Sequence, residues 1–169
     1  MRRRLLPRLY VQLHASLELN AAHPEAHLFA ALCAARRHDD ALALQLLTRA
    51  RELAPHNAEI VRDYGALLVR MGRPAEALPW LRRAVAMLRQ LYELGESSAH
   101  ARGALASAHV KLSAALVGVN EHAACVRTVR AAVSLDRTLE PALAGLRELC
   151  TNAPREGRDT SGVRIEIAL

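Results

Sequence analysis

Apolar and small residues recur at three- and four-residue steps along residues 57–88, in two runs separated by a short turn. Gly72 is placed to end the first helix, and Pro74 is placed at the first position of the second helix. The spacing therefore predicts two amphipathic helices that fold back on each other as a helical hairpin. Gly65 and the alanines of the second run are small enough to let the two helices approach closely. The positions that share a face are Val61, Tyr64, Leu68 and Val69 in the first helix, and Ala77, Leu78, Leu81, Ala84, Val85 and Leu88 in the second.

The same pattern stands one 34-residue step upstream, where Pro55 follows the second helix. The matched pairs are Ala43 and Ala77, Leu44 and Leu78, Leu47 and Leu81, and Ala50 and Ala84. A helix–turn–helix unit with a 34-residue period is typical of the tetratricopeptide repeat, and the chain resembles that family over about residues 24–150. The resemblance implies an all-α fold, a right-handed α-solenoid of stacked antiparallel helical hairpins.

The repeat register divides the chain into one helical repeat domain, residues 1–151, and a tail, residues 152–169. Within the domain we expect repeats at about 24–57, 58–91 and 106–139, and capping helices at 5–20 and 139–150. The tail is expected to be a flexible linker followed by a segment, 163–169, whose alternating apolar residues are typical of a strand. The segment is either disordered, placed in its own groove or that of a neighbour, or part of a binding interface.

The third repeat starts later than the period requires. Its beginning, near Ala106, lies 48 residues after Ala58, which leaves 14 residues more than one repeat. Two antiparallel helices that share these residues would each be about two turns, or roughly 10 Å, longer. We therefore expect a projecting hairpin at about 86–105, with its tip at Gly95–Ser98. The alternative, a loop without structure, is less consistent with a segment so rich in leucine and alanine.

Three local features have a structural and a functional interpretation. Asp39 is expected to cap the second helix of the first repeat rather than to act with Asp40 in catalysis. Trp80, beside the helix-bending Pro79, is expected to pack in the core, with an exposed contact as the alternative. His23 stands before the first helix, so we expect an ordinary turn there rather than a zinc site.

The composition favours closely stacked helices and leaves the partner open. Hydrophobic residues make up 51% of the chain but aromatic residues only 3%, which indicates a core packed by alanine and leucine. The formal net charge is +6, and Lys111 is the only lysine among 23 basic residues. A basic balance permits acidic proteins or nucleic acid as partners and proves neither.

The cysteines and the hydropathy pattern bear on the compartment. Cys33, Cys125 and Cys150 are odd in number and lack CxxC spacing, so we expect buried free thiols in a reducing compartment. No apolar run approaches the length of a membrane span, and Pro7 and Arg8 interrupt what would be the apolar region of a signal peptide. A cytoplasmic location is therefore expected.

The resemblance also implies where a ligand binds, because the first helix of each repeat in this family lines a concave groove. The groove positions that the register assigns are Glu25, Leu28, Leu32 and Arg36 in the first repeat, Glu59, Arg62, Ala66, Val69 and Arg70 in the second, and Val110, Ala114 and Val117 in the third. An apolar floor flanked by arginines suits an amphipathic helix or an extended segment with apolar anchors and some acidic residues. The alternative is that the N-terminal helix or the C-terminal tail fills the groove in the free protein.

The sequence carries no Gly-rich phosphate loop, no clustered metal-ligand spacing and no nucleophile motif, so we predict no catalytic, cofactor or metal site. The predicted function is that of a non-catalytic scaffold or adaptor for protein–protein interaction. The first alternative is a bacterial chaperone of the type III secretion kind, which the chain resembles in size and architecture. The second is a nucleic-acid-binding helical repeat, or a regulatory fragment of a larger enzyme. A homo-oligomer formed through the tail or the hairpin stays open, and a membrane partner is not expected.

Overall fold

The computed structural model describes residues 22–94, 98–157 and 159–161. These residues form seven α-helices and one short 3-10 helix, and the expected all-α class is confirmed. The predicted helix at 5–20, most of the predicted hairpin tip and the predicted strand at 163–169 lie outside the described residues. The helices are α2 (Pro24–Arg36), α3 (Asp40–Leu53), α4 (Ala58–Arg70), α5 (Pro74–Glu93), α6 (Ala99–Gly118), α7 (His122–Leu135), η2 (Arg137–Leu139) and α8 (Glu140–Glu156).

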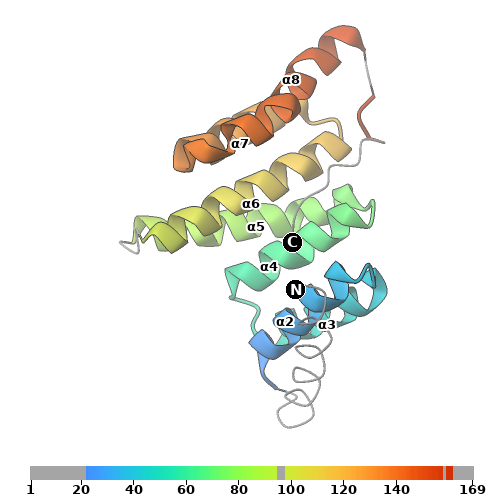
Figure 1. The fold of residues 1–169 in the computed structure, drawn as a ribbon, viewed down its shortest axis with the longest axis vertical. Helices are drawn as coiled ribbons and strands as arrows, with labels where there is room; N and C mark the ends of the chain where they lie inside the picture. Colours follow the sequence, from blue (N-terminus) through green and yellow to red (C-terminus); the bar gives the residue numbers. More distant parts are fainter. Residues whose placement is uncertain (1–21, 95–97, 158, 162–169) are drawn as a thin grey trace, which may run out of the picture.

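The helices pack in chain order as antiparallel pairs, and each pair stacks on the next (Figure 1). The pairs are α2 with α3, α4 with α5, and α6 with α7, while α8 packs on α7. The helix α4 also contacts α6 directly, so the first helices of these two hairpins lie side by side. This is the arrangement of a helical repeat of the tetratricopeptide kind.

Side chains cap the starts of several helices, and one of these caps was predicted from the sequence. The carboxylate of Asp39 accepts a hydrogen bond of 3.1 Å from the backbone N–H of Leu42, which confirms Asp39 as an N-cap. Asn57 caps α4 in the same way through its side-chain oxygen. His23 lies outside α2, and its Nδ1 accepts from the N–H of Ala26. Each cap pairs a backbone donor that would otherwise lack a partner at the start of a helix.

Small residues occupy the contacts between the helices. Gly65 of α4 lies against Leu81 of α5 so closely that an added Cβ would stand 2.7 Å from the Leu81 Cγ. The alanines at matched repeat positions are completely buried: Ala43, Ala50, Ala77 and Ala84. Because these side chains are short, the neighbouring helix backbones can pack at close range at these positions.

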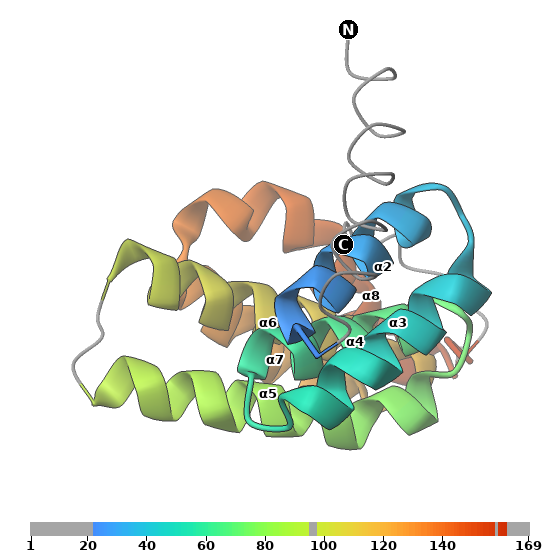
Figure 2. The ribbon, with the colours of Figure 1, turned by 90° about the horizontal axis from the view of Figure 1, so that it is seen from below.

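Two of the helices are longer than the others. The helices α5 and α6 have 20 residues each, whereas α2 and α4 have 13 residues each. Figure 2 shows that α5 and α6 extend together beyond the neighbouring helices. Near the far end of α5, Leu91 and Leu94 are 42% and 75% exposed. The added length lies where the sequence has its 14 extra residues.

Trp80 packs into the body of the protein, between the first and second hairpins. Its ring centre lies 5.5 Å from that of Tyr64 in an edge-to-face arrangement. The Arg51 guanidinium stands 4.6 Å from the Tyr64 ring centre and 4.3 Å from that of Trp80. Trp80 thus joins α3, α4 and α5, which agrees with its interpretation as a packing residue, and α5 continues through Pro79 without a break.

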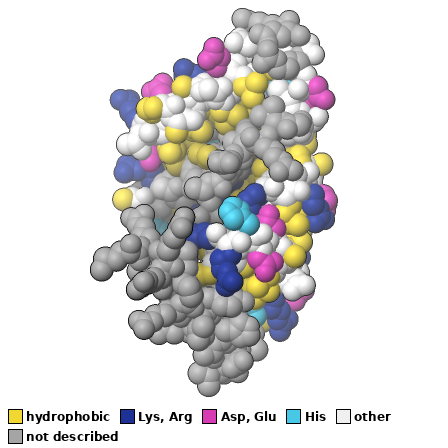
Figure 3. Space-filling view, turned by 45° about the vertical axis from the view of Figure 1, so that its right-hand side comes forward, with side chains coloured by type: hydrophobic (Ala, Val, Ile, Leu, Met, Phe, Trp, Pro, Cys, Tyr) yellow, Lys and Arg dark blue, Asp and Glu magenta, His cyan; other side chains and the backbone are white. Residues whose placement is uncertain are grey.

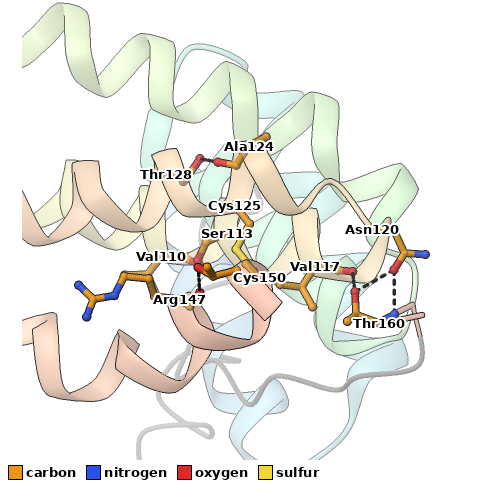
Figure 4. Close-up of a disulfide and its surroundings, with 11 residues drawn as sticks. Val110, Ser113, Val117, Asn120, Ala124, Cys125, Thr128, Arg147, Cys150 and Thr160 are labelled. Atoms are coloured by element: carbon orange, nitrogen blue, oxygen red, sulfur yellow. Dashed lines mark hydrogen bonds between the residues drawn. A yellow bond between two sulfur atoms is a disulfide. The ribbon is translucent and has the colours of Figure 1, made fainter. Parts of the chain in front are cut away.

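The expectation of free thiols is wrong for two of the three cysteines. Cys125 of α7 and Cys150 of α8 form a disulfide, with their Cα atoms 6.4 Å apart (Figure 4). The antiparallel packing of α8 on α7 brings together two residues that are 25 positions apart, a proximity that spacing along the sequence does not reveal. Cys33 is free and buried.

The last helix is also longer than predicted. The sequence predicted a capping helix at 139–150, followed by a flexible linker after residue 151. The helix α8 continues to Glu156 and ends at Gly157, which has a positive φ of 62°. Leu143, Cys150 and Ala153 repeat at helical spacing and are all buried, and this continuous apolar face holds the extra turn.

Reduction of the Cys125–Cys150 disulfide should lower the free energy of unfolding. The bridge closes a loop of 25 residues in the unfolded chain, a constraint worth about 3 kcal/mol. We expect Cys150→Ser to lower the melting temperature under oxidising conditions and to make it insensitive to a reductant. Cys33→Ser is the control, and a melting temperature of the wild type that a reductant does not change would contradict the prediction.

Gly65→Ala should destabilise the protein, because its new methyl group would meet the Leu81 side chain at 2.7 Å. Overpacking of this kind costs about 1–3 kcal/mol. The matched control is Gly103→Ala, since nothing lies within 4 Å of a Cβ added at Gly103 in α6. There the higher helix propensity of alanine should raise stability slightly. Chemical denaturation of both variants measures the difference, and equal effects at the two positions would contradict the close approach of α4 and α5.

Candidate protein-binding groove

The predicted groove residues all lie on α2, α4 and α6, the first helices of three successive hairpins. Two of them, Glu25 and Arg36, are exposed at the start and end of α2. Six are partly exposed: Leu32, Glu59, Arg62, Val69, Arg70 and Val110. The remaining four are buried: Leu28, Ala66, Ala114 and Val117. The assignment of these residues to a ligand stays a prediction, and the structure limits how many of them a ligand could reach.

Arg70 is engaged within the protein. Its Nη1 donates a hydrogen bond of 3.0 Å to the carbonyl oxygen of Ala35 at the end of α2. Its Nη2 forms an ion pair with Asp40 at the start of α3. The guanidinium therefore joins the second hairpin to the first and pairs a carbonyl at the end of a helix. The sequence interpretation had assumed that Arg70 offers a free positive charge at the edge of the groove. The structure shows instead that its guanidinium is bound to Ala35 and Asp40.

Arg62 also has a partner within the protein. It forms two hydrogen bonds with the neighbouring Asp63, 2.8 Å from Nε to Oδ1 and 3.1 Å from Nη2 to Oδ2. Burial lowers the pKa of the Arg62 guanidinium, but these bonds and the charges of Asp63 and Glu59 outweigh it, so the pKa is raised overall. The Arg62 side chain is 15% exposed.

Lys111 of α6 completes a buried charge cluster with Arg62 and Asp63, which we call the α4–α6 charge cluster. The Lys111 Nζ lies 3.8 Å from the Asp63 Oδ1, and both residues are only 4% exposed. Burial lowers the pKa of Lys111, while the Asp63 carboxylate acts in the opposite direction. Charges buried this deeply need a paired arrangement. The cluster thus fixes α4 against α6 within the predicted groove.

Sequence reasoning missed Asp63 and Lys111. A signal was present for Lys111, because it is the only lysine of the chain and directly follows the predicted groove position Val110. For Asp63 there was none, since an acidic residue in a helix is ordinarily exposed. Only the packing of α4 on α6 brings the two residues together.

A second set of contacts ties the end of the described chain to α6, and we call it the C-terminal clasp. The backbone N–H of Thr160 donates a hydrogen bond of 2.8 Å to the Asn120 Oδ1. The Thr160 hydroxyl lies 2.9 Å from the carbonyl oxygen of Val117 and 2.8 Å from the Asn120 Oδ1 (Figure 4). The Asn120 Nδ2 in turn donates to Asp159 at 2.7 Å. Thr160 is fully buried, so this contact is a packed one.

The clasp depends on an unusual backbone at the turn between α6 and α7. Asn120 has a positive φ of 61°, a conformation that asparagine tolerates better than most residues. Hydrogen bonds from the backbone N–H of Ser161 and from the Asn120 amide lower the pKa of the Asp159 carboxyl. The hydrogen bonds that the Asp159 carboxylate accepts therefore stabilise its charged form.

Charged side chains do not gather by sign on the face that Figure 3 shows. Basic and acidic side chains lie close to one another there, between apolar areas. Several exposed arginines of the described residues are paired with a carboxylate, as Arg73 is with Glu76 and Arg82 with Glu121. The net positive charge is therefore partly neutralised locally.

Antiparallel hairpins stacked in chain order, with the first helices α4 and α6 in contact, define a helical-repeat protein, a class that generally binds other proteins along the surface of the array. Residues 32–86 match the family model described as tetratricopeptide repeat. This part of the chain is thus a tetratricopeptide-repeat segment, as the resemblance predicted. No curated protein matches the chain. Among the described residues, no helix is both long and apolar enough to span a membrane.

Asp63→Ala should strongly destabilise the fold, because it would leave Lys111 and Arg62 without their shared carboxylate in a buried place. Breaking one partner of a buried ion pair costs about 3 kcal/mol or more. The matched control is Glu52→Ala, which removes one partner of the exposed pair with Arg49 and should change stability little. Denaturant titration measures both variants, and similar small effects would contradict a structural role for the α4–α6 charge cluster.

Proposed function

We propose that this protein is a non-catalytic scaffold that binds an amphipathic segment of another protein along α2, α4 and α6. The observation that carries the proposal is the row of partly exposed apolar residues on these three helices, Leu32, Val69 and Val110. Each stands on the first helix of a different hairpin, so together they follow the stacking direction. An apolar row of this kind suits a ligand that inserts several apolar side chains in sequence.

The margins of this row favour a partner that also carries acidic residues. Arg36 is exposed at the end of α2. Arg62 keeps 15% of its side chain exposed beside the row. Arg70 is bound to Ala35 and Asp40 and contributes less to such a contact than the sequence suggested. The charge on the partner therefore supports orientation, and the apolar anchors supply most of the affinity.

Two other functions fit the observations less well. A chaperone of the type III secretion kind would use the same surface for an exported client, and it rests on the similar size and architecture alone. A nucleic-acid-binding repeat would need a positive surface of one sign. The paired arginines and the mixed charges in Figure 3 favour a protein partner over nucleic acid.

The cytoplasmic location expected from the sequence belongs to this proposal and has one observation against it. Disulfides persist mainly in oxidising compartments, and Cys125 and Cys150 form one. A transient or redox-dependent disulfide would reconcile the two. The thiol state of the protein isolated from its source under alkylating conditions decides between them.

The proposal is tested by placing a charge on the apolar row. We expect Leu32→Glu to weaken partner capture from the native lysate at least about tenfold, which corresponds to roughly 1.4 kcal/mol. Gln45→Glu is the matched control, because Gln45 is exposed on α3, the second helix of the same hairpin, and gains the same charge. Far-ultraviolet circular dichroism and thermal melts verify that both variants are folded.

Nuclease treatment of the same lysate separates the alternatives. A protein partner that survives nuclease, is lost with Leu32→Glu and is retained with Gln45→Glu is the expected result. Unchanged capture by Leu32→Glu would show that the apolar row is not the binding surface. Loss of all partners on nuclease treatment, with steep weakening as salt rises, would favour nucleic-acid binding.

A further inference from the structure

The Cys125–Cys150 disulfide lies inside the packing between α7 and α8. Cys125 is 0% exposed and Cys150 is 2% exposed. Val110 and Ser113 of α6 lie in the surroundings of the bridge (Figure 4), and Ser113 is completely buried. Thiol–disulfide exchange needs direct access to a sulfur atom. A reductant therefore reaches this bond only when α8 moves away from α7.

Few other buried side chains hold α8 in place. Besides Cys150, the buried side chains among the α8 residues whose exposure is described are Leu143 and Ala153. Leu146 and Leu149 are partly buried against the same core. Local stability follows the amount of buried apolar surface, so a helix held by so few side chains opens more easily than the body of the protein. The covalent bond to α7 therefore supplies a large part of the docking of α8.

The sequence of α8 also favours opening. Gly145 lies within the helix, and a Cβ added there would meet nothing within 4 Å, so this glycine lowers helix stability without serving a close contact. Pro154 lies in the last turn and has no N–H, so it cannot donate the helical hydrogen bond to the carbonyl oxygen of Cys150. A helix of 17 residues with these two interruptions is not stable by itself in water. Once undocked, α8 therefore unwinds.

The chain is anchored on both sides of α8. Before the helix, η2 packs on α7. After the helix, the Thr160 hydroxyl lies 2.9 Å from the carbonyl oxygen of Val117, and the Thr160 backbone N–H donates to Asn120. These anchors keep an opened α8 close to α7 and favour its return. Opening of α8 is thus a local and reversible event.

We propose that Cys125 and Cys150 form a redox switch that controls the docking of α8. In the disulfide form, α8 stays on α7. In the dithiol form, α8 opens and closes repeatedly, while α2 to α7 remain folded. The number of helices in the folded array therefore depends on the redox state. This proposal goes beyond the proposed function and does not depend on it.

The reaction partner of the switch is a dithiol reductant. One thiolate of the reductant attacks one sulfur of the bridge while α8 is open, and a mixed disulfide forms as the other cysteine leaves as a thiolate. The second thiolate of the reductant then attacks the mixed disulfide and releases the first cysteine. The protein gains two electrons and two protons in the form of two thiols, and the reductant becomes a disulfide. Exchange in the opposite direction restores the bridge.

Alkylation of the reduced protein under native conditions tests the proposal. The full chain is reduced with dithiothreitol and treated with iodoacetamide, and mass spectrometry measures the reaction rate at each cysteine. Cys33 of α2 is the internal reference, because its 8% exposure exceeds that of Cys125 and Cys150. If α8 stayed docked, Cys33 would react first. We expect the opposite order, with Cys125 and Cys150 reacting at least about tenfold faster than Cys33.

Two outcomes of this experiment would overturn the proposal. One is a rate at Cys125 and Cys150 that is equal to or lower than the rate at Cys33. The other is a bridge that dithiothreitol does not reduce under native conditions, because α8 would then not open far enough for exchange.

Two glycine variants separate local opening from unfolding of the whole protein. Gly145→Ala should stabilise α8 and slow the alkylation of Cys150 about fourfold, as the higher helix propensity of alanine predicts. Gly103→Ala is the matched control in α6, because a Cβ added at either position meets nothing within 4 Å. It should leave the rate at Cys150 unchanged, since α6 stays folded. Equal effects of the two variants, including no effect of either, would show that opening of α8 does not expose Cys150 and would overturn the proposal.

Discussion

Small side chains at the contacts between neighbouring helices set the geometry on which the rest of this protein depends. Ala43, Ala50, Ala77 and Ala84 are completely buried, and Gly65 has no room for a Cβ beside Leu81. Because each hairpin is closed this tightly, the first helices of successive hairpins can lie next to each other, as α4 and α6 do. The side-by-side arrangement then creates both the apolar row and the α4–α6 charge cluster. The proposed binding surface thus follows from packing that carries no chemical function itself.

The C-terminal end of the described chain is held by a different kind of contact. The helix α8 packs on α7 without a second helix of its own among the described residues. The Cys125–Cys150 disulfide and the C-terminal clasp each add a connection there, one to α7 and one to the end of α6. Terminal units of repeat proteins have only one neighbour and need such extra stabilisation.

The helical hairpins could be predicted from the sequence because each depends on local signals. Periodic apolar residues, Gly72 and Pro74 at a turn, and the Asp39 cap all act within a few residues of one another. The disulfide, the α4–α6 charge cluster and the clasp could not be predicted, since each joins residues on different elements whose approach depends on the whole stack. Asp63 and Lys111 are 48 positions apart, and Val117 and Thr160 are 43 apart. The polar composition after Cys150 predicted a linker. In the structure α8 continues to Glu156, because the burial of Ala153 stabilises the additional turn.

The central claim is that the first helices of the repeats form the surface that holds a partner segment. Chemical-shift mapping tests it most directly, with the isotopically labelled protein titrated by the partner or by a peptide derived from it. The account predicts shifts concentrated on α2, α4 and α6, including the backbone amides of Leu32, Val69 and Val110. Shifts confined to α3, α5 and α7, or to the far ends of α5 and α6 near Leu94, would contradict it and place the binding surface on another face.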